Sequence, residues 1–249
     1  MFGGLFSRKN KNSAPPIDFS FAKTDMHSHL IPGVDDGSQS LEESMTLIKA
    51  LYSLGFRKLI TTPHVMHDFY RNSAVTILDG LEQLREAVKL QPELNGLVLE
   101  ASAEYYVDEG LREKIEKKEI LTFGKNFLLF EISYINAPDN LDDIIFTMQT
   151  NGYQPVMAHP ERYPFWYDNF EKFTRLKDKG VLFQVNSNSL TGYYSPNARR
   201  FAERLIDNNM VEFIGSDTHN ARHLESLQKC MSEKYLRILS EKGVLNAQL

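Results

Sequence analysis

Cysteine is nearly absent from this 249-residue sequence: Cys230 is the only one, so no disulfide can form within the chain. This composition is typical of proteins in reducing compartments, and we expect a cytoplasmic protein. Long apolar runs are also lacking, since none approaches the roughly 20 residues of a membrane-spanning helix. Positive charge is scarce too, with 28 Lys and Arg against 33 Asp and Glu and a formal net charge of −5. The chain therefore has no basic footprint for nucleic acid.

The first 20 residues differ in character from the rest of the chain. A short apolar stretch, residues 1–6, comes first, and three basic residues and two prolines follow it. A secretory signal has the opposite order, with its charges before a longer apolar region. We therefore expect a loose tail over residues 1–20. No linker-like segment interrupts the chain after the tail, so residues 21–249 are predicted to form one domain.

After the tail, short apolar runs rich in β-forming residues alternate with amphipathic helical segments. The runs lie at residues 22–26, 58–62, 97–103, 127–132, 154–158, 181–186 and 211–216. Helical patterns lie between Ser40 and Gly55 and at 76–90, 140–149, 169–179, 198–208 and 222–240. Seven βα units of this kind predict an α/β fold, a distorted TIM-like (β/α)7 barrel with parallel strands.

Five of the seven histidines lie where a predicted strand ends, and carboxylates accompany them. The set is His27, His29, Asp36, His64, Glu104, Glu131, His159, Asp217 and His219. Because the carboxyl ends of barrel strands meet at one face, we expect these side chains to converge. Residues two apart on a strand point the same way, so His27 and His29 can face one ion. Imidazole and carboxylate are natural ligands of Mn, Fe or Zn, and the pattern predicts a metal site.

Other polar residues near the strand ends are weaker candidates. Asp25 and Asp35 are interpreted as helix caps or as partners that orient a ligating histidine. His67 and His223 lie past the strand ends, and we expect both on the surface. Glu100, at the far end of the strand that carries Glu104, is predicted to have a structural or supporting role.

Two arginines follow candidate ligands at a spacing of three residues. Arg162 comes after His159, and Arg222 comes after His219. A guanidinium group can grip two phosphate oxygens at once, although a solvated arginine fits the sequence equally well. Aromatic residues also crowd these segments. We expect most of them to pack in the core or at the rim, and one or two to flank an aromatic substrate ring. They are Tyr105, Tyr106, Tyr163, Trp166, Tyr193 and Tyr194.

In chain order, the candidate residues form a series of short motifs. The motifs are His27-Ser-His29, Val34-Asp-Asp36-Gly, Thr62-Pro-His64, Ala103-Glu104-Tyr-Tyr, Phe130-Glu131-Ile, Ala158-His159-Pro-Glu-Arg162-Tyr and Gly215-Ser-Asp217-Thr-His219-Asn. The series resembles the PHP superfamily (polymerase and histidinol phosphatase). More narrowly, it is similar to the manganese-dependent bacterial protein-tyrosine phosphatases of capsule and exopolysaccharide synthesis. This resemblance implies a PHP-type barrel and a metal-dependent phosphatase.

The resemblance also implies a ligand set for two or three Mn²⁺ ions, with Fe or Zn as alternatives. One ion would be held by His27, His29, Glu104 and Asp217. A second would be held by Glu104, Glu131 and His159, and a third by Asp36, His64 and His219. Arg162 and Arg222 would grip the phosphoryl oxygens.

The reaction that the resemblance implies is hydrolysis of phosphotyrosine in a protein by a metal-bound hydroxide. The implied substrate is the tail of a bacterial tyrosine kinase that controls polysaccharide export. A thiol-dependent tyrosine phosphatase is excluded, because it needs an arginine six positions after its cysteine and Leu236 stands there. Three alternatives stay open: a small-molecule phosphomonoesterase such as a histidinol-phosphate phosphatase, a phosphodiesterase or nuclease, and an inert scaffold.

Overall fold

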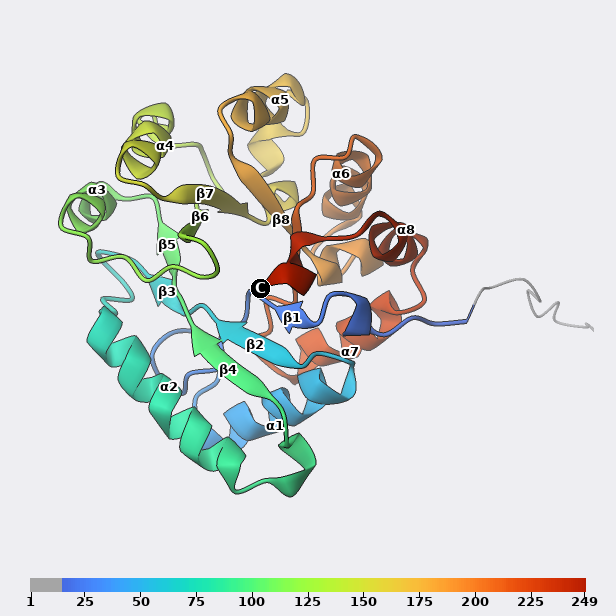
Figure 1. Ribbon diagram of the computed structural model, residues 1–249. Helices are drawn as coiled ribbons and strands as arrows, with labels where there is room; N and C mark the ends of the chain where they lie inside the picture. The colour runs from blue at the N-terminus through green and yellow to red at the C-terminus, as the bar shows by residue number, and fades with distance from the viewer. Residues whose placement is uncertain (1–14) are drawn as a thin grey trace, which may run out of the picture.

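The computed structural model describes residues 15–249 (Figure 1). Most of the predicted tail, residues 1–14, lies outside the described residues. The last part of that tail packs against the fold, because the N–H of Ile17 donates to the carbonyl of Met231 at 2.9 Å. Phe19 is fully buried, in a short 3-10 helix over Phe19–Phe21. Contact with the body of the protein therefore starts before residue 21.

The strands are all parallel and form a sheet that curls around on itself (Figure 1). One part joins β1 (Thr24–Asp25), β2 (Lys58–Thr61) and β4 (Val98–Ala101). The other joins β3 (His64–Val65), β5 (Glu104–Tyr106), β6 (Phe127–Glu131), β7 (Gln154–Ala158), β8 (Leu182–Asn186) and β9 (Phe213–Gly215). Each of the seven predicted runs contains a strand.

Two of the seven runs end at breaks that lie side by side, and a second short strand follows each break. The second run changes from β2 to β3 at Thr62 and Pro63, and the third changes from β4 to β5 at Ser102 and Ala103. Across the breaks, the N–H of Ser102 donates to Thr61 at 2.9 Å and the N–H of Glu104 donates to Pro63 at 3.1 Å. Proline has no N–H to donate to a ladder, which explains why the regular pairing stops there.

The first and last strands also meet, so the sheet closes. The N–H of Asp217 donates to the carbonyl of His27 at 2.7 Å, and the N–H of His29 donates to that of Thr218 at 3.0 Å. Asp25 in β1 accepts both the N–H and the hydroxyl of Ser216, at 2.8 and 2.6 Å. Burial raises the pKa of Asp25 to about 6. The predicted fold class, a distorted parallel barrel of α/β type, is confirmed.

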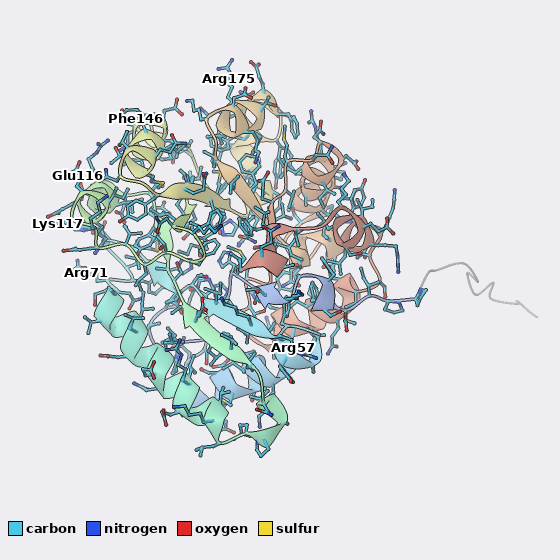
Figure 2. The ribbon with its side chains drawn as sticks, in the orientation of Figure 1. Arg57, Arg71, Glu116, Lys117, Phe146 and Arg175 are labelled. Carbon is cyan, nitrogen blue, oxygen red and sulfur yellow. The ribbon has the colours of Figure 1, made fainter. Side chains whose placement is uncertain are left out.

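Helices cover the outside of the curled sheet (Figure 1). They are α1 (Leu41–Ser53), α2 (Ala74–Lys89), α3 (Glu109–Glu116), α4 (Leu141–Thr150), α5 (Glu171–Asp178), α6 (Pro196–Asp207), α7 (Ala221–Cys230) and α8 (Lys234–Lys242). Figure 2 shows charged side chains of the outer helices, such as Glu116, Lys117 and Arg175, pointing away from the barrel. Among residues 15–249, no helix is both long enough and apolar enough to cross a membrane.

Helix prediction from the sequence was wrong in two places. The pattern of α3 was missed, because its eight residues bury only Leu111 and Ile115. The predicted helix at 222–240 is two helices, α7 and α8, separated by a turn. The end of α7 is fixed by Cys230, whose thiol donates to the carbonyl of Ser187 at 3.1 Å, and the turn is held where Glu233 pairs with Arg199 at 2.8 Å.

Two apolar clusters define where the site can lie. The larger cluster fills the space between the sheet and the helices. The smaller one includes Met26, Ile60, Leu129, Val156 and Phe213, which come from five of the seven strand runs. Side chains two apart on a strand share a face, so Leu129 of this cluster and the candidate ligand Glu131 point to the same side of β6. The apolar cluster forms a floor, and the polar residues lie above it.

The contact between β1 and β9 yields a stability prediction. Replacing Asp25 with Ala leaves the buried N–H of Ser216 without its acceptor, so we expect the free energy of unfolding to fall by about 1–3 kcal/mol. Urea denaturation of chelator-treated protein measures the change without a contribution from bound metal. The control is Asp139→Ala at an exposed loop position, expected to stay within about 0.5 kcal/mol of the parent. Equal stability of both variants would show that the Asp25–Ser216 contact does not hold the closure.

Candidate metal centre

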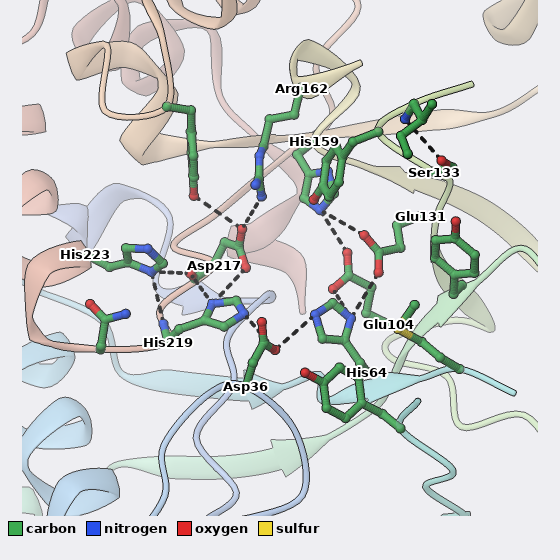
Figure 3. A pocket seen from close by; sticks show the side chains of 17 residues that line it. Asp36, His64, Glu104, Glu131, Ser133, His159, Arg162, Asp217, His219 and His223 are labelled. Carbon is green, nitrogen blue, oxygen red and sulfur yellow. Dashed lines mark hydrogen bonds and ion pairs between the residues drawn. The ribbon is translucent and has the colours of Figure 1, made fainter. Parts of the chain in front are cut away.

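A cavity of about 550 Å³ opens at the carboxyl ends of the strands (Figure 3). Seven of the nine predicted ligands line it. They are Asp36, His64, Glu104, Glu131, His159, Asp217 and His219. The other two, His27 and His29, are fully buried and contact Glu104 and Asp217. The structure therefore brings together all nine residues that the sequence singled out as metal ligands.

The deepest group combines the His27–His29 pair with two carboxylates. The Nε2 atoms of these histidines are 3.3 Å apart, and they lie 3.5 and 3.4 Å from Oδ1 of Asp217. Oε2 of Glu104 lies 3.2 Å from the Nε2 of His27 and 3.5 Å from that of His29. Four donor atoms thus face one small volume, the arrangement predicted for the first ion.

Glu104 also belongs to a second group. Its Oε1 lies 2.9 Å from Nε2 of His159, which is 3.9 Å from Oε2 of Glu131. The Nδ1 atom of His64 lies 3.2 Å from Oε2 of Glu104 and 3.1 Å from Oε1 of Glu131. The second predicted set is thus divided between two groups that share Glu104. His159 lies with Glu104 and His27, and Glu131 lies with Glu104 and His64.

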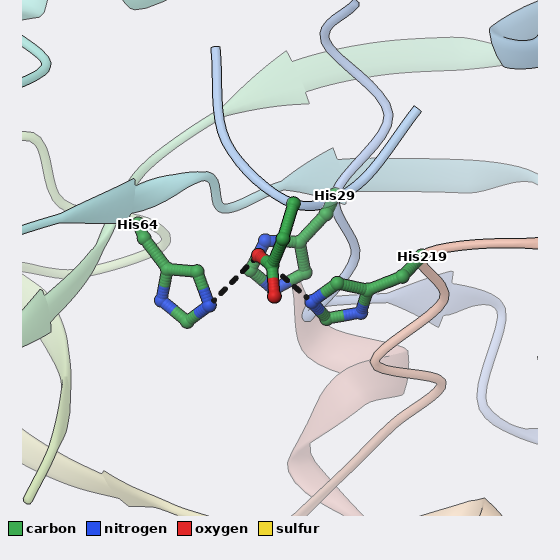
Figure 4. Close-up of side chains that lie close together, drawn as sticks. His29, His64 and His219 are labelled. Carbon is green, nitrogen blue, oxygen red and sulfur yellow. Dashed lines mark ion pairs between the residues drawn. The ribbon is translucent and has the colours of Figure 1, made fainter. Parts of the chain in front are cut away.

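The third group lies nearest the mouth of the cavity. Oδ1 of Asp36 lies 3.4 Å from Nε2 of His64 and 3.5 Å from Nε2 of His219. Figure 4 shows His64 and His219 on either side of this carboxylate, with His29 beside them. One atom from each of these four residues lies within 4.8 Å of the others. His29 and His64 thus join this group to the two deeper ones.

The donor atoms fit a cation better than they fit one another. Nδ1 of His64 is buried without a hydrogen-bond partner of acceptable geometry, although two carboxylate oxygens lie within 3.2 Å. Burial lowers the pKa of His64, but Glu104 and Glu131 outweigh this effect and raise the pKa to about 9. The same negative field favours a bound metal ion. Nitrogen and oxygen donors without sulfur suit Mn, Fe or Zn.

The remaining nitrogen of each deep histidine is held by a buried acceptor. Asp35 Oδ2 lies 2.8 Å from Nδ1 of His29 and also accepts the N–H of His64 at 3.0 Å. Gln184 Oε1 lies 2.7 Å from Nδ1 of His27. Such partners fix the ring orientation and the tautomer, so that Nε2 faces the metal. Asp35 thus has the orienting role that the sequence left open, whereas Asp25 contacts Ser216 and belongs to none of the three groups.

Asp217 is braced from its outer side. Its Oδ2 accepts the Asn186 amide at 2.6 Å, Arg162 at 3.1 Å and the Tyr194 hydroxyl at 3.3 Å. Asp217 and His159 also have positive φ angles, 49° and 34°, which non-glycine residues rarely adopt. Such backbone conformations cost on the order of 1–3 kcal/mol each and persist where the surroundings enforce them. The backbone is strained at two of the predicted ligand positions.

The two predicted arginines have different locations. Arg162 lines the cavity, with its guanidinium 4.7 Å from the Tyr134 ring and 4.1 Å from the Tyr194 ring. Arg222 is exposed at the start of α7 and does not line the cavity. Its contact with a phosphoryl group stays a prediction.

The structure also shows where three further residues with predicted locations or roles lie. His223 was expected on the surface and is buried instead: its Nδ1 accepts the N–H of His219 at 3.1 Å and lies 2.8 Å from the carbonyl of Asp217. His67 is exposed, as predicted. Glu100 pairs with Lys58 at 2.7 Å, which is a structural role.

Several lining residues were missed from the sequence. Of the aromatic residues singled out, Tyr106 and Tyr194 line the cavity, whereas Tyr105, Tyr163 and Trp166 are buried core residues. Tyr70, Tyr134 and Ile135 line it without having been predicted. Gln184 and Asn186 had a signal that could have found them, because two polar residues in alternation at the end of β8 point into the same interior as the histidines.

Comparisons with known proteins agree with this geometry. The family described as capsular polysaccharide synthesis, CpsB/CapC, matches residues 23–242. The tyrosine-protein phosphatase CpsB of Streptococcus pneumoniae is 30% identical over 235 residues, which cover 90% of this chain and 93% of the relative. The tyrosine-protein phosphatase YwqE of Bacillus subtilis (strain 168) is 28% identical over 199 residues, 80% of this chain and 78% of the relative.

A solved structure supports the same relationship. It is described as belonging to YwqE from Bacillus subtilis and CpsB from Streptococcus pneumoniae, metal-dependent tyrosine phosphatases. It matches with a TM-score of 0.78 at 25% identity, over 90% of this chain and 94% of the other. The resemblance predicted from the motifs is confirmed, and the chain belongs to the CpsB/CapC family.

Proposed function

We propose that this protein is a metal-dependent protein-tyrosine phosphatase of capsule or exopolysaccharide synthesis. One observation carries the proposal: nine histidine and carboxylate side chains converge at a cavity whose wall also holds Arg162 and several aromatic rings. The family and the names of its members support the same activity. The protein substrate we propose is the tyrosine-phosphorylated tail of a bacterial tyrosine kinase.

We assign the metal ligands as the family resemblance implies, and propose Mn²⁺ as the ion. His27, His29, Glu104 and Asp217 would form one site. A second would use Glu104, Glu131 and His159, and a third Asp36, His64 and His219. The short distances from His64 to Glu104 and Glu131 favour a compact cluster in which carboxylates are shared. Bound ions would supply Lewis acidity and would lower the pKa of water in the site toward neutrality.

The protein's own groups position the phosphate ester. Arg162 points into the cavity and keeps a fixed direction, because Asp217 binds one of its N–H groups and two tyrosine rings flank the guanidinium. The remaining N–H groups are free to grip phosphoryl oxygens in pairs. Tyr70, Tyr106 and Tyr134 offer aromatic surface for the phenol ring. Phenolate is a good leaving group, since phenol has a pKa of about 10, so a dedicated general acid is not required.

The substrate class can be tested directly. We expect a phosphotyrosyl peptide to be hydrolysed far faster than histidinol phosphate when both are supplied with Mn²⁺, because the aromatic wall matches a phenol ring. A chelator should stop turnover, and Asp217→Asn should lower it on the order of 10³-fold. The control is Cys230→Ser, which should keep full activity because the thiol is buried and its pKa is raised by burial. A preference for histidinol phosphate would contradict the proposal.

The role of Gln184 gives a prediction about metal binding. Replacing it with Ala frees the ring of His27 to rotate, and we expect the affinity for Mn²⁺ to fall about 10- to 100-fold. Calorimetric titration of the metal-free protein measures this without reference to activity. Gln149→Ala is the matched control, since Gln149 donates to a surface carbonyl, that of Lys179. If both variants bind metal like the parent, His27 does not depend on Gln184.

A substitution can separate the contribution of the paired N–H groups of Arg162 from that of its positive charge. Arg162→Lys keeps a positive charge but loses the paired N–H groups, so we expect kcat/KM for an aryl phosphate to fall on the order of 10²-fold. Arg237→Lys on α8, at a half-buried arginine outside the cavity that donates to the carbonyl of Pro15, serves as the control. Metal content is measured in both variants, and a normal content in Arg162→Lys assigns the loss to phosphate binding. An unchanged rate would remove Arg162 from the proposed machinery.

A further inference from the structure

The cavity of the metal centre does not end at Arg162. A second cavity of about 370 Å³ shares Tyr134, Arg162 and Tyr194 with it. A third, of about 490 Å³, shares Pro164, Tyr167 and Asn197 with the second. Because neighbouring cavities share lining residues, the three lie in a row that leads from the metal centre along the segment after β7 and the helix α6. We call the part beyond Arg162 the side groove.

The far end of the side groove carries positive charge without matching negative charge. Arg200 and Arg204 line it, one helical turn apart on α6, and both are exposed. Among residues 15–249, no carboxylate lies within 4.0 Å of either guanidinium, whereas the adjacent Arg199 pairs with Glu203 and Glu233. One acidic residue, Asp168, also lines this end, so two cations face one anion.

Neighbouring side chains hold both guanidinium groups in place. Arg204 lies 3.9 Å from the centre of the Phe170 ring, and Arg200 donates to the side chain of Asn197. Neither of these partners neutralises the charge. In a chain with a net charge of −5, an unpaired and ordered cation pair is a local exception that suits an anionic ligand.

The floor of the side groove suits a polypeptide. Pro164, Tyr167, Ala198 and Phe201 supply apolar surface along it. A protein substrate whose phosphotyrosine occupies the metal-centre cavity must leave that cavity along the rim, and the side groove adjoins it. Adjacency to the metal centre, through the shared residues Tyr134, Arg162 and Tyr194, therefore favours the substrate's own chain as the occupant.

We propose that the side groove binds the segment next to the phosphotyrosine, and that Arg200 and Arg204 select acidic side chains in that segment. The inference rests on the proposed function and names the substrate class within it: phosphotyrosine with Asp or Glu nearby. Exposed charge pairs are individually weak, so the expected selection is modest. It affects the binding of the substrate, and salt reduces it by screening the charges.

The experiment compares four phosphotyrosyl peptides of equal length with Mn²⁺ supplied. Two carry glutamates on one side or the other of the phosphotyrosine, one carries glutamine at all these positions, and one carries lysine. We expect the wild-type enzyme to show a KM about 5- to 20-fold lower for one glutamate peptide than for the glutamine peptide. The ratio of the two KM values should shrink toward one at high salt. An aryl phosphate, which has no peptide segment, should not lose affinity through this effect.

Charge reversal on α6 tests the two arginines. Arg200→Glu/Arg204→Glu should raise KM for the preferred glutamate peptide by the same factor, leave the kinetics of the aryl phosphate unchanged, and now favour the lysine peptide. Arg200→Gln/Arg204→Gln should abolish the preference without reversing it. The control is Arg71→Glu/Lys125→Glu, which changes the net charge equally at exposed positions outside the side groove and should keep the wild-type preference.

The outcomes distinguish the two proposals. Equal KM values for the glutamate and glutamine peptides, or a preference that survives charge reversal, overturn the role of the side groove and leave the phosphatase proposal standing. A wild-type enzyme that hydrolyses the aryl phosphate but none of the four peptides overturns the proposed function, and the side-groove proposal falls with it.

Discussion

Negative charge concentrated in a buried space is the constraint on which the rest of this structure depends. Glu104, Glu131 and Asp217 are at most 3% exposed, and burying an ionised carboxylate costs several kcal/mol unless positive charge lies beside it. Burial alone would raise the pKa of Glu104, but His27 and His64 outweigh it and hold the pKa well below its ordinary value. The site is therefore stable only with cations, and a divalent metal ion is the natural one. Any metal bound to the native state but not to the unfolded chain also stabilises the fold.

The backbone delivers these groups by ending or breaking its strands where they are needed. His159 and Asp217 follow β7 and β9 in the left-handed region of φ, which turns each side chain away from the line of its strand. The paired breaks at Pro63 and Ser102 shift β3 and β5 relative to β2 and β4, and these displaced strands begin with His64 and Glu104. The distortion of the barrel and the formation of the site are thus the same structural event.

The sequence predicted what depends on local pattern and strand direction. Alternating apolar runs predicted the curled parallel sheet, and the spacing of His27 and His29 predicted a shared target for their side chains. Prediction from the sequence failed where the position of a residue depends on tertiary contacts. The two arginines followed histidines at equal spacing, yet Arg162 lines the cavity and Arg222 does not. His223 looked like a loop residue, but the first turn of α7 places it against Asp217. The break between α7 and α8 depends on contacts with Ser187 and Arg199, which no helical periodicity encodes.

Tyr194 explains how substrate binding and metal geometry can depend on one another. Its hydroxyl contacts Asp217, its ring lies against the guanidinium of Arg162, and it lines both the metal-centre cavity and the cavity beside it. On our proposal, a small phosphate ester would occupy only the first cavity and would reach one side of this residue. A polypeptide that continues into the side groove packs on the ring from the other side as well. It thereby restricts the same tyrosine that fixes the carboxylate and the arginine. Since catalysis improves when charged groups are held in place before reaction, the longer substrate gains positioning that the small one cannot.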